Sequence, residues 1–260
     1  MKYALLGGSV VACALLALLA SLTFSPPLAE FLCAASYGLA SVMGLLNAAN
    51  YGRHDRLRWA WLCFGLGYLF GFASAVAFGT RPDAERMTTL AVTLWNLCVL
   101  FLNVFLVASE AWFARMWSNT GLAPPGRLGA TIVFLALALL FDGKAALHDI
   151  GLLAHGNVRA LSDLTSLTTD IISIGLVGPI FATVIALRGG LLVRPWIFLF
   201  LSSFAWLLDD ATVLLPHHAA AADLFTRVLA VQFAFAAAMA QRLVRADLSA
   251  AMAKDLPPLD

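Results

Sequence analysis

Residues 88–113 of the chain are TTLAVTLWNLCVLFLNVFLVASEAWF, a stretch with a single charged side chain, Glu110, near its end. A transmembrane helix needs about 20 consecutive, mostly apolar residues, so this stretch is long enough to cross a bilayer. The whole chain has the same character, since 62% of its 260 residues are hydrophobic, 12% are charged and the mean hydropathy is +0.88. Soluble domains carry about 25% charged residues, so the composition excludes a soluble globular protein, a disordered chain and a nucleic-acid-binding protein.

Eight stretches of this kind predict an all-α, polytopic membrane bundle of eight transmembrane helices. They lie at about residues 3–22, 28–49, 58–79, 88–113, 129–154, 163–187, 195–215 and 222–243. Turn-forming residues separate them, as at Pro26-Pro27, Pro124-Pro125-Gly126 and Gly189-Gly190. The first stretch continues unbroken to Leu22, so we interpret it as a retained helix and not as a cleaved signal peptide.

The distribution of lysine and arginine predicts the orientation, because cytoplasmic segments carry an excess of both. If the N-terminus is inside, the outer loops hold only Arg81, Arg86 and Arg159. The inner segments then hold Lys2, Arg53, Arg56, Arg58, Arg115, Arg127, Arg188, Arg194, Arg242, Arg245 and Lys254. Both termini are therefore predicted to be cytoplasmic, in a bacterial-type inner membrane. Five tryptophans fall near the same interface, where an aromatic belt would lie: Trp59, Trp61, Trp112, Trp117 and Trp196.

The chain divides into two halves by the charge that its predicted helices carry. Residues 1–127 hold the first four helices and almost no ionisable side chain inside them. Residues 128–260 hold the last four helices, a buried charge cluster and a short cytoplasmic tail. A faint repeat, Arg58-Trp59 against Arg194-Pro195-Trp196, is compatible with two parallel four-helix repeats. The alternative is that any two apolar helices align this well.

Charged side chains inside the last four helices are the candidate ligand- or ion-binding residues. They are Asp142, Lys144, His148, Asp149, Asp170, Asp209, Asp210 and Arg227. With a rise of 1.5 Å per residue, Asp142, Asp209 and Asp210 lie roughly 20 Å from the inner ends of their helices, and Asp170 falls at nearly the same level. Ionisable residues at this depth usually face a cavity, a partner helix or one another. The sequence therefore predicts a polar layer in the outer half of the bilayer.

Helical spacing adds directions to these depths. Asp142 and Asp149 are seven residues apart and share one face of their helix, whereas Lys144 and His148 form a second stripe roughly 120° away. Successive helical residues are about 100° apart, so Asp209 and Asp210 cannot both face one partner.

Two interpretations of the layer stay open. In the first, Asp142 or Asp170 pairs with Lys144 or Arg227, and the ion pairs only hold the bundle together. In the second, the carboxylates outnumber the cations, and the unpaired acids bind a proton, a cation or a small ligand. The second interpretation leads to a sensor, a receptor or a complex subunit, or to a small proton- or cation-coupled transporter with Asp142, Asp170 and Asp209 as carriers.

Metal and cofactor chemistry finds little support in the residue pattern. A metal-dependent membrane enzyme would need ligands such as His148, Asp149 and Asp170, but no HxxxH or HExxH pattern is present. Haem is not expected, because only His148 is even partly embedded. Retinal is not expected either, because Lys144 lies in the fifth predicted helix and not in the last. We interpret His217 and His218 as solvated loop residues.

Residues 178–210 resemble the multi-helix membrane modules that precede output domains in bacterial sensor histidine kinases and diguanylate cyclases. The residues that carry the resemblance are Pro179, Arg188-Gly189-Gly190, Pro195-Trp196 and Trp206-Leu207-Leu208-Asp209. Only a short tail follows Arg245, and it contains no output domain. The resemblance implies a non-enzymatic sensory or ligand-binding module. Its expected partners are the lipid bilayer and another membrane or signalling protein, and nucleic acid is not among them.

Overall fold

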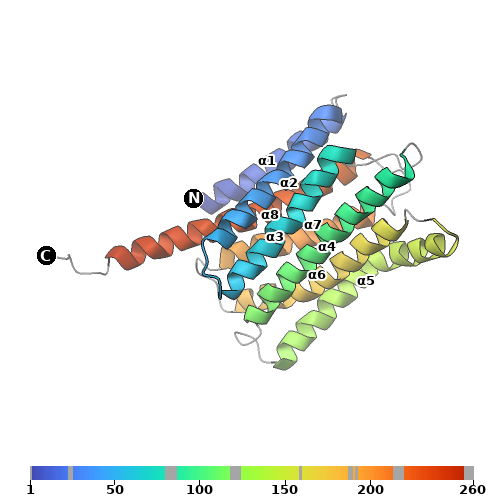
Figure 1. The fold of residues 1–260 in the computed structure, drawn as a ribbon. Coiled ribbons are helices and arrows are strands. Elements are labelled where there is room, and N and C mark those ends of the chain that lie inside the picture. The colour runs from blue at the N-terminus through green and yellow to red at the C-terminus, as the bar shows by residue number, and fades with distance from the viewer. Residues whose placement is uncertain are drawn as a thin grey trace.

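A computed structural model describes residues 2–22, 26–79, 87–117, 124–157, 160–186, 190, 193–212 and 220–254. These residues form eight helices and no strand, as the sequence predicts (Figure 1). The helices are α1 (Lys2–Leu22), α2 (Pro26–Ala49), α3 (Arg56–Phe78), α4 (Thr89–Trp117), α5 (Pro124–Ala154), α6 (Ala160–Ala186), α7 (Arg194–Thr212) and α8 (Ala220–Lys254). Of the residues in the predicted outer loops and turns, Arg81, Arg86, Arg159, His217 and His218 lie outside the described ones.

Seven of the eight helices are long and apolar enough to cross a membrane. The exception is α7, which carries Arg194 at its first position and Asp209 and Asp210 close to its last. Its apolar side chains are nevertheless inside the protein, with Ala205 and Leu207 buried. The chain is therefore an integral membrane protein by the composition of its other seven helices, and α7 lies among them with its charged end close to the predicted polar layer.

Six of the helices close into a ring. Each of α2, α3, α4, α6, α7 and α8 packs against the next, and α8 packs back against α2. The two remaining helices lie outside the ring, α1 against α2 and α8, and α5 against α6 and α7. Figure 1 shows them on opposite flanks of the bundle. Residues that the ring encloses are shielded from lipid. Asp142 belongs to α5, which packs on the outside of the ring against α6 and α7.

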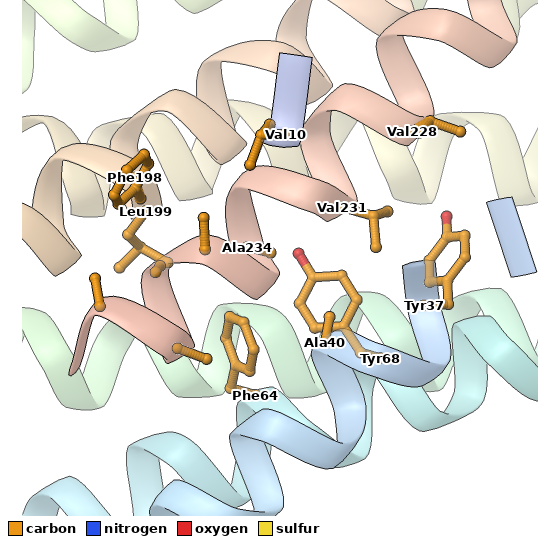
Figure 2. Close-up of a cluster of buried hydrophobic side chains, with 14 of the residues drawn as sticks. Val10, Tyr37, Ala40, Phe64, Tyr68, Phe198, Leu199, Val228, Val231 and Ala234 are labelled. Atoms are coloured by element: carbon orange, nitrogen blue, oxygen red, sulfur yellow. The ribbon is translucent and has the colours of Figure 1, made fainter. Parts of the chain in front are cut away.

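Small residues bring the helices of the ring close together. The α8 side chains that face the neighbouring helices include Ala230, Ala234, Ala237 and Ala238, all fully buried (Figure 2). Between α2 and α3 the backbones themselves touch, because a Cβ on Gly44 would lie 2.9 Å from the Cα of Gly65. Close contact between small residues is typical of helix packing in membranes, where lipid supplies no hydrophobic driving force.

Aromatic side chains close the ring at one end. Trp61 of α3 lies 5.1 Å from Phe113 of α4, Phe113 lies 5.1 Å from Trp196 of α7, and Trp196 lies 5.4 Å from Trp117, all as ring-centroid distances with edge-to-face geometry. Phe64 completes this aromatic plug at 5.2 Å from Trp61. Edge-to-face pairs at this spacing are attractive beyond the area that they bury.

The aromatic plug changes the expectation of a lipid-facing tryptophan belt. Trp59 is exposed, as a belt residue would be, but Trp61 and Trp196 are buried inside the bundle. These two tryptophans pack against aromatic residues of neighbouring helices, and that packing turns them away from lipid. Trp61 and Trp196 lie near the beginnings of α3 and α7, as predicted, but their side chains face the interior of the bundle and not the lipid.

The start of α1 and the end of α8 lie at the same end of the bundle (Figure 1). The Lys2 ammonium lies 3.2 Å from Asp247 near the end of α8. Close by, the Arg245 guanidinium lies over the Tyr51 ring, and the Gln241 amide donates a hydrogen bond of 2.8 Å to the Tyr51 hydroxyl. Burial raises the pKa of Tyr51 above its ordinary value. These contacts attach the last turns of α8 to the connection between α2 and α3.

Candidate functional site

The neighbouring acids Asp209 and Asp210 of α7 meet different partners. Asp209 accepts hydrogen bonds from the Arg227 guanidinium of α8, at 3.4 Å from Nε and 3.3 Å from Nη2. Asp210 instead lies beside the carboxyl group of Asp170 on α6, and its Oδ2 is buried without a hydrogen-bond partner among the described residues. The predicted divergence of the two side chains is confirmed, because about 100° of helical rotation directs one to α8 and the other to α6.

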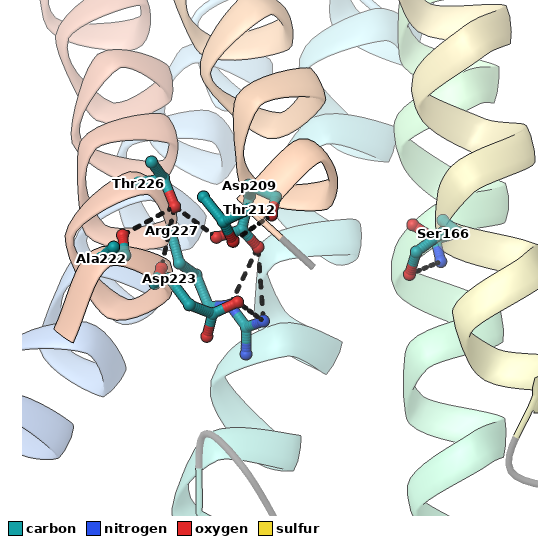
Figure 3. Close-up of polar contacts among 8 residues, drawn as sticks. Ser166, Asp209, Thr212, Ala222, Asp223, Thr226 and Arg227 are labelled. Atoms are coloured by element: carbon teal, nitrogen blue, oxygen red, sulfur yellow. Dashed lines mark hydrogen bonds and ion pairs between the residues drawn. The ribbon is translucent and has the colours of Figure 1, made fainter. Parts of the chain in front are cut away.

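The first of these surroundings is an arginine network formed by Asp209, Asp223, Thr226 and Arg227 (Figure 3). Arg227 Nη2 also lies 3.5 Å from Asp223 Oδ1, one turn earlier on α8. The Thr226 hydroxyl donates to Asp209 Oδ1. Arg227 therefore lies between two buried carboxylates and compensates both, as a buried charge in a membrane requires.

The second is an acid cluster formed by Asp142 of α5, Asp170 of α6 and Asp210 of α7. Asp142 lies close enough to act electrostatically on both other carboxyl groups. It is fully buried, and neither of its carboxyl oxygens has a hydrogen-bond partner among the described residues. Two adjacent carboxyl groups repel each other when both are ionised, and a proton on one of them removes that repulsion.

The other candidates on α5 divide between its two faces. Asp149 is buried, on the face of Asp142, while Lys144 and His148 are exposed. This division agrees with the two stripes predicted from helical spacing. It also separates Lys144 from the acid cluster, so the predicted pairing of Asp142 with Lys144 is not formed. Asp142 does not pair with Arg227 either, because the guanidinium binds Asp209 and Asp223.

The geometry offers little to a metal ion. Within the described ranges, no three His, Cys, Asp or Glu side chains come together as ligands. His148, the only nitrogen ligand of the predicted metal set, is on the exposed face of α5. The four cysteines are free thiols on α1 to α4.

One acid in the interior of the ring, Glu110 of α4, was not among the predicted site residues. Its side chain is 7% exposed, and its Oε1 accepts a hydrogen bond of 3.3 Å from the Ser203 hydroxyl of α7. Ser173 of α6 and Glu110 line the wall of the same cavity. Sequence reasoning placed it near the end of a helix at Phe113, but α4 continues to Trp117 and carries Glu110 deeper into the bundle.

A spacing in α4 does point to Glu110. Asn96, Asn103 and Glu110 are seven residues apart and therefore form one polar stripe. Asn103 donates a hydrogen bond of 3.2 Å to Ser166 of α6, which Figure 3 labels. Glu110 and Ser173, each seven residues further along its helix, line one cavity. The polar stripes of α4 and α6 thus match in register, and Asp170 lies between the two serines on α6.

Glu110 and Asp170 line the same cavity inside the ring. Its volume is about 10 Å³, and α3, α4, α6 and α7 all contribute to its wall. The lining residues are Phe64, Tyr68, Leu106, Ser109, Glu110, Asp170, Ser173, Leu199, Ser202, Ser203 and Trp206. A cavity of this size holds about one water molecule. It has no room for an organic ligand.

Comparison with known proteins adds no assignment to this geometry. No protein-family model, curated protein or solved structure matches the chain. The chemistry of the site therefore rests on its own geometry: one arginine that compensates two acids, and three further nearby acids that have no ion pair among the described residues.

Proposed function

We propose that the protein is a proton-binding membrane module in which the Asp170–Asp210 pair takes up and releases a proton. The proximity of these two buried carboxyl groups carries the proposal, because a proton on one of them allows it to donate a hydrogen bond to the other and removes their repulsion. Asp142 adds a third acid beside the pair, and its oxygens have no other partner among the described residues. Release of the proton leaves three adjacent acids in a medium of low dielectric, where their repulsion is large.

A proton fits this site better than a metal cation or an organic ligand. Within the described ranges no three His, Cys, Asp or Glu side chains come together as metal ligands. The adjoining cavity of about 10 Å³ has room for a water molecule only. The cation- and ligand-binding alternatives would both need the helices to move apart.

The proposed role is sensing from one side of the membrane. The aromatic plug lies at the end of the ring where α3 and α7 begin and α4 ends, and it separates the acid cluster from that end. The excess of lysine and arginine at this end favours the cytoplasmic side, in an inner membrane with both termini inside. The acid cluster then exchanges protons with the outer side. A cytoplasmic partner reads the protonation state at the exposed last turns of α8.

Infrared spectroscopy of the purified protein in lipid nanodiscs tests the proposal, because a protonated carboxyl group has a carbonyl stretching band that an ionised one lacks. We expect the wild type to show this band at neutral pH and to lose it as the pH rises. Asp170→Asn and Asp210→Asn should each remove a component of the band. Glu30→Gln is the matched control, since Glu30 is an exposed acid on α2.

If neither aspartate substitution changes the carboxyl band, the acid pair holds no proton and the proposal is wrong. Proteoliposomes with a trapped pH indicator decide between sensing and proton-coupled transport. A one-sided module leaves the internal pH unchanged after an external pH jump. A flux that Asp170→Asn abolishes would instead establish transport and contradict the sensing role.

A further inference from the structure

The cavity inside the ring brings together two acids that belong to different helices. Glu110 reaches it from α4 and Asp170 from α6, and Tyr68 of α3 faces it from a third side. Tyr68 and Asp170 are the titratable groups that line the cavity beside Glu110, while α7 contributes Ser202, Ser203 and Trp206 to its wall. The acid cluster and Glu110 are therefore separated by a space about one water molecule wide.

Two polar atoms at this cavity indicate what occupies it. Glu110 Oε2 and Ser109 Oγ are buried and have no hydrogen-bond partner among the described residues. Glu110 is 7% exposed and Ser109 is fully buried. A buried polar atom without a partner costs about 1–3 kcal/mol, and buried waters typically satisfy such atoms through about three hydrogen bonds each. Glu110, Ser109 and Asp170 offer a water three polar groups.

The position of Glu110 along the bundle gives the pathway a direction. Ser173, which lines the cavity with Glu110, lies three residues after Asp170 on α6, about one helical turn further along. Phe113 of the aromatic plug lies three residues after Glu110 on α4. Going from the acid pair towards the plug, the order is therefore Asp170, the cavity, Glu110 and then the aromatic rings, where polar groups stop.

We propose that a single water in this cavity connects Asp170 to Glu110, and that Glu110 is the inner station of a proton relay that ends at the aromatic plug. The relay rests on the proposed proton binding by the acid pair. In the transfer step, protonated Asp170 gives its proton to the water while the water gives one of its own to the Glu110 carboxylate. The products are the Asp170 carboxylate, a neutral Glu110 and an unchanged water.

The transfer moves one negative charge from α4 to α6, beside Asp142 and Asp210. The Asp170–Asp210 contact then lacks its proton unless another arrives from outside. Proton occupancy of Glu110 is thereby linked to the packing of α6 against α7, two helices whose contact forms part of the ring. The relay gives the site two proton-accepting positions at different depths, and only the outer one exchanges with solvent directly.

Infrared titration of Glu110→Gln and Ser109→Val tests the relay. Glu110→Gln should remove one carboxyl component, leave that of the acid pair in place and shift the pH at which the pair titrates. Ser109→Val fills the cavity without breaking a recorded hydrogen bond. Ser109→Val should retain the Glu110 carboxyl component. Adding Glu110→Gln to Ser109→Val should then leave the pH at which the acid pair titrates unchanged. Glu30→Gln again serves as the control.

The outcomes separate the two proposals. If Asp210→Asn changes the carboxyl band but Glu110→Gln changes neither the band nor the titration of the pair, the relay is wrong and proton binding by the pair stands. If Asp210→Asn is silent, the proposed function fails whatever Glu110 does. Persistent coupling in Ser109→Val would exclude a water in the cavity as the connection. Circular dichroism of each variant checks that the helices are retained.

Discussion

The arginine network and the acid cluster both contain buried aspartates and are adjacent on α7. The network includes a cation, Arg227, whereas the acid cluster consists of carboxyl groups alone. Asp209 faces a guanidinium and a hydroxyl donor, whereas Asp210, the next residue, faces a second carboxyl group. The network is compensated by fixed charge within the protein. The acid cluster has no ion pair among the described residues, so its negative charge can be neutralised only by a bound proton or another mobile cation. Asp209 of the ion pair and Asp210 of the proposed titrating site are therefore consecutive residues, whose side chains point about 100° apart around α7.

Removing the cation tests the structural side of this comparison and has the largest expected effect. Arg227→Met leaves Asp209 and Asp223 buried without their guanidinium, and breaking a buried pair in this way costs about 3–5 kcal/mol. We expect a pronounced loss of thermal stability, followed by intrinsic fluorescence in detergent. Arg242→Met, an exposed position on the same helix, is the control and should change little. Equal stability of the two variants would mean that the network is not structural.

Neutralising each of the two neighbouring aspartates in turn contrasts the sites directly. Asp209→Asn weakens a charge-assisted interaction and should cost about 2 kcal/mol. Asp210→Asn replaces a shared proton by an amide donor to Asp170 and should cost less. Under the proposed function, the pair binds a proton in the folded state at pH values where the separated acids of the unfolded chain are ionised. Wild-type stability should therefore fall as the pH rises.

The pH dependence identifies which aspartate belongs to which site. Asp210→Asn should flatten the decline of stability with pH, because its amide donates without titrating. Asp209→Asn should lower stability at every pH but retain the decline. Denaturation curves at several pH values measure both quantities. Parallel curves for wild type and Asp210→Asn would contradict the assignment.

Removing an acid from the cluster should raise stability. Asp142 is fully buried, and its two oxygens have no partner among the described residues, so its burial costs free energy that Leu does not incur. We expect Asp142→Leu to stabilise the protein by about 1–2 kcal/mol and to simplify its pH dependence. A destabilised Asp142→Leu variant would show that Asp142 has a structural partner and that the cluster is less acidic than proposed.

The smallest effect should come from the hydroxyl donor of the arginine network. Thr226→Val keeps the shape of the side chain but removes the hydrogen bond to Asp209, at an expected cost of about 1 kcal/mol. Because Arg227 still compensates Asp209, the pH dependence of stability should not change. Thermal unfolding at two pH values measures both. A change in the pH dependence would show that the two sites are coupled through Asp209.

Much of the fold could be predicted because the bilayer limits the possibilities. Apolar runs locate the helices, and the 1.5 Å rise per residue brings Asp142, Asp170, Asp209 and Asp210 to one level. Spacing also indicates which residues share a face, as with Asp142 and Asp149. For α7, however, apolar composition alone does not indicate a membrane-spanning helix.

The partners of the site residues could not be predicted, for a definite reason. A pattern in one helix gives relative directions but not the rotation of the helix about its own axis. The sequence therefore separated Asp209 from Asp210 without showing which of them meets Arg227. Glu110 was missed because the end of α4 was placed one turn early, although the spacing of Asn96, Asn103 and Glu110 contained the signal.

Helix α8 is the longest of the described helices and a member of the ring. The helix carries Arg227 of the arginine network and, 18 residues later, Arg245 over the Tyr51 ring, so a rigid rod of about 27 Å joins the two contacts. Side chains of α2 and α7 donate hydrogen bonds to the Ala238 and Ala230 carbonyls of the same helix, between these two contacts. The charged interior and the exposed end of the bundle are therefore connected by one unbroken helix.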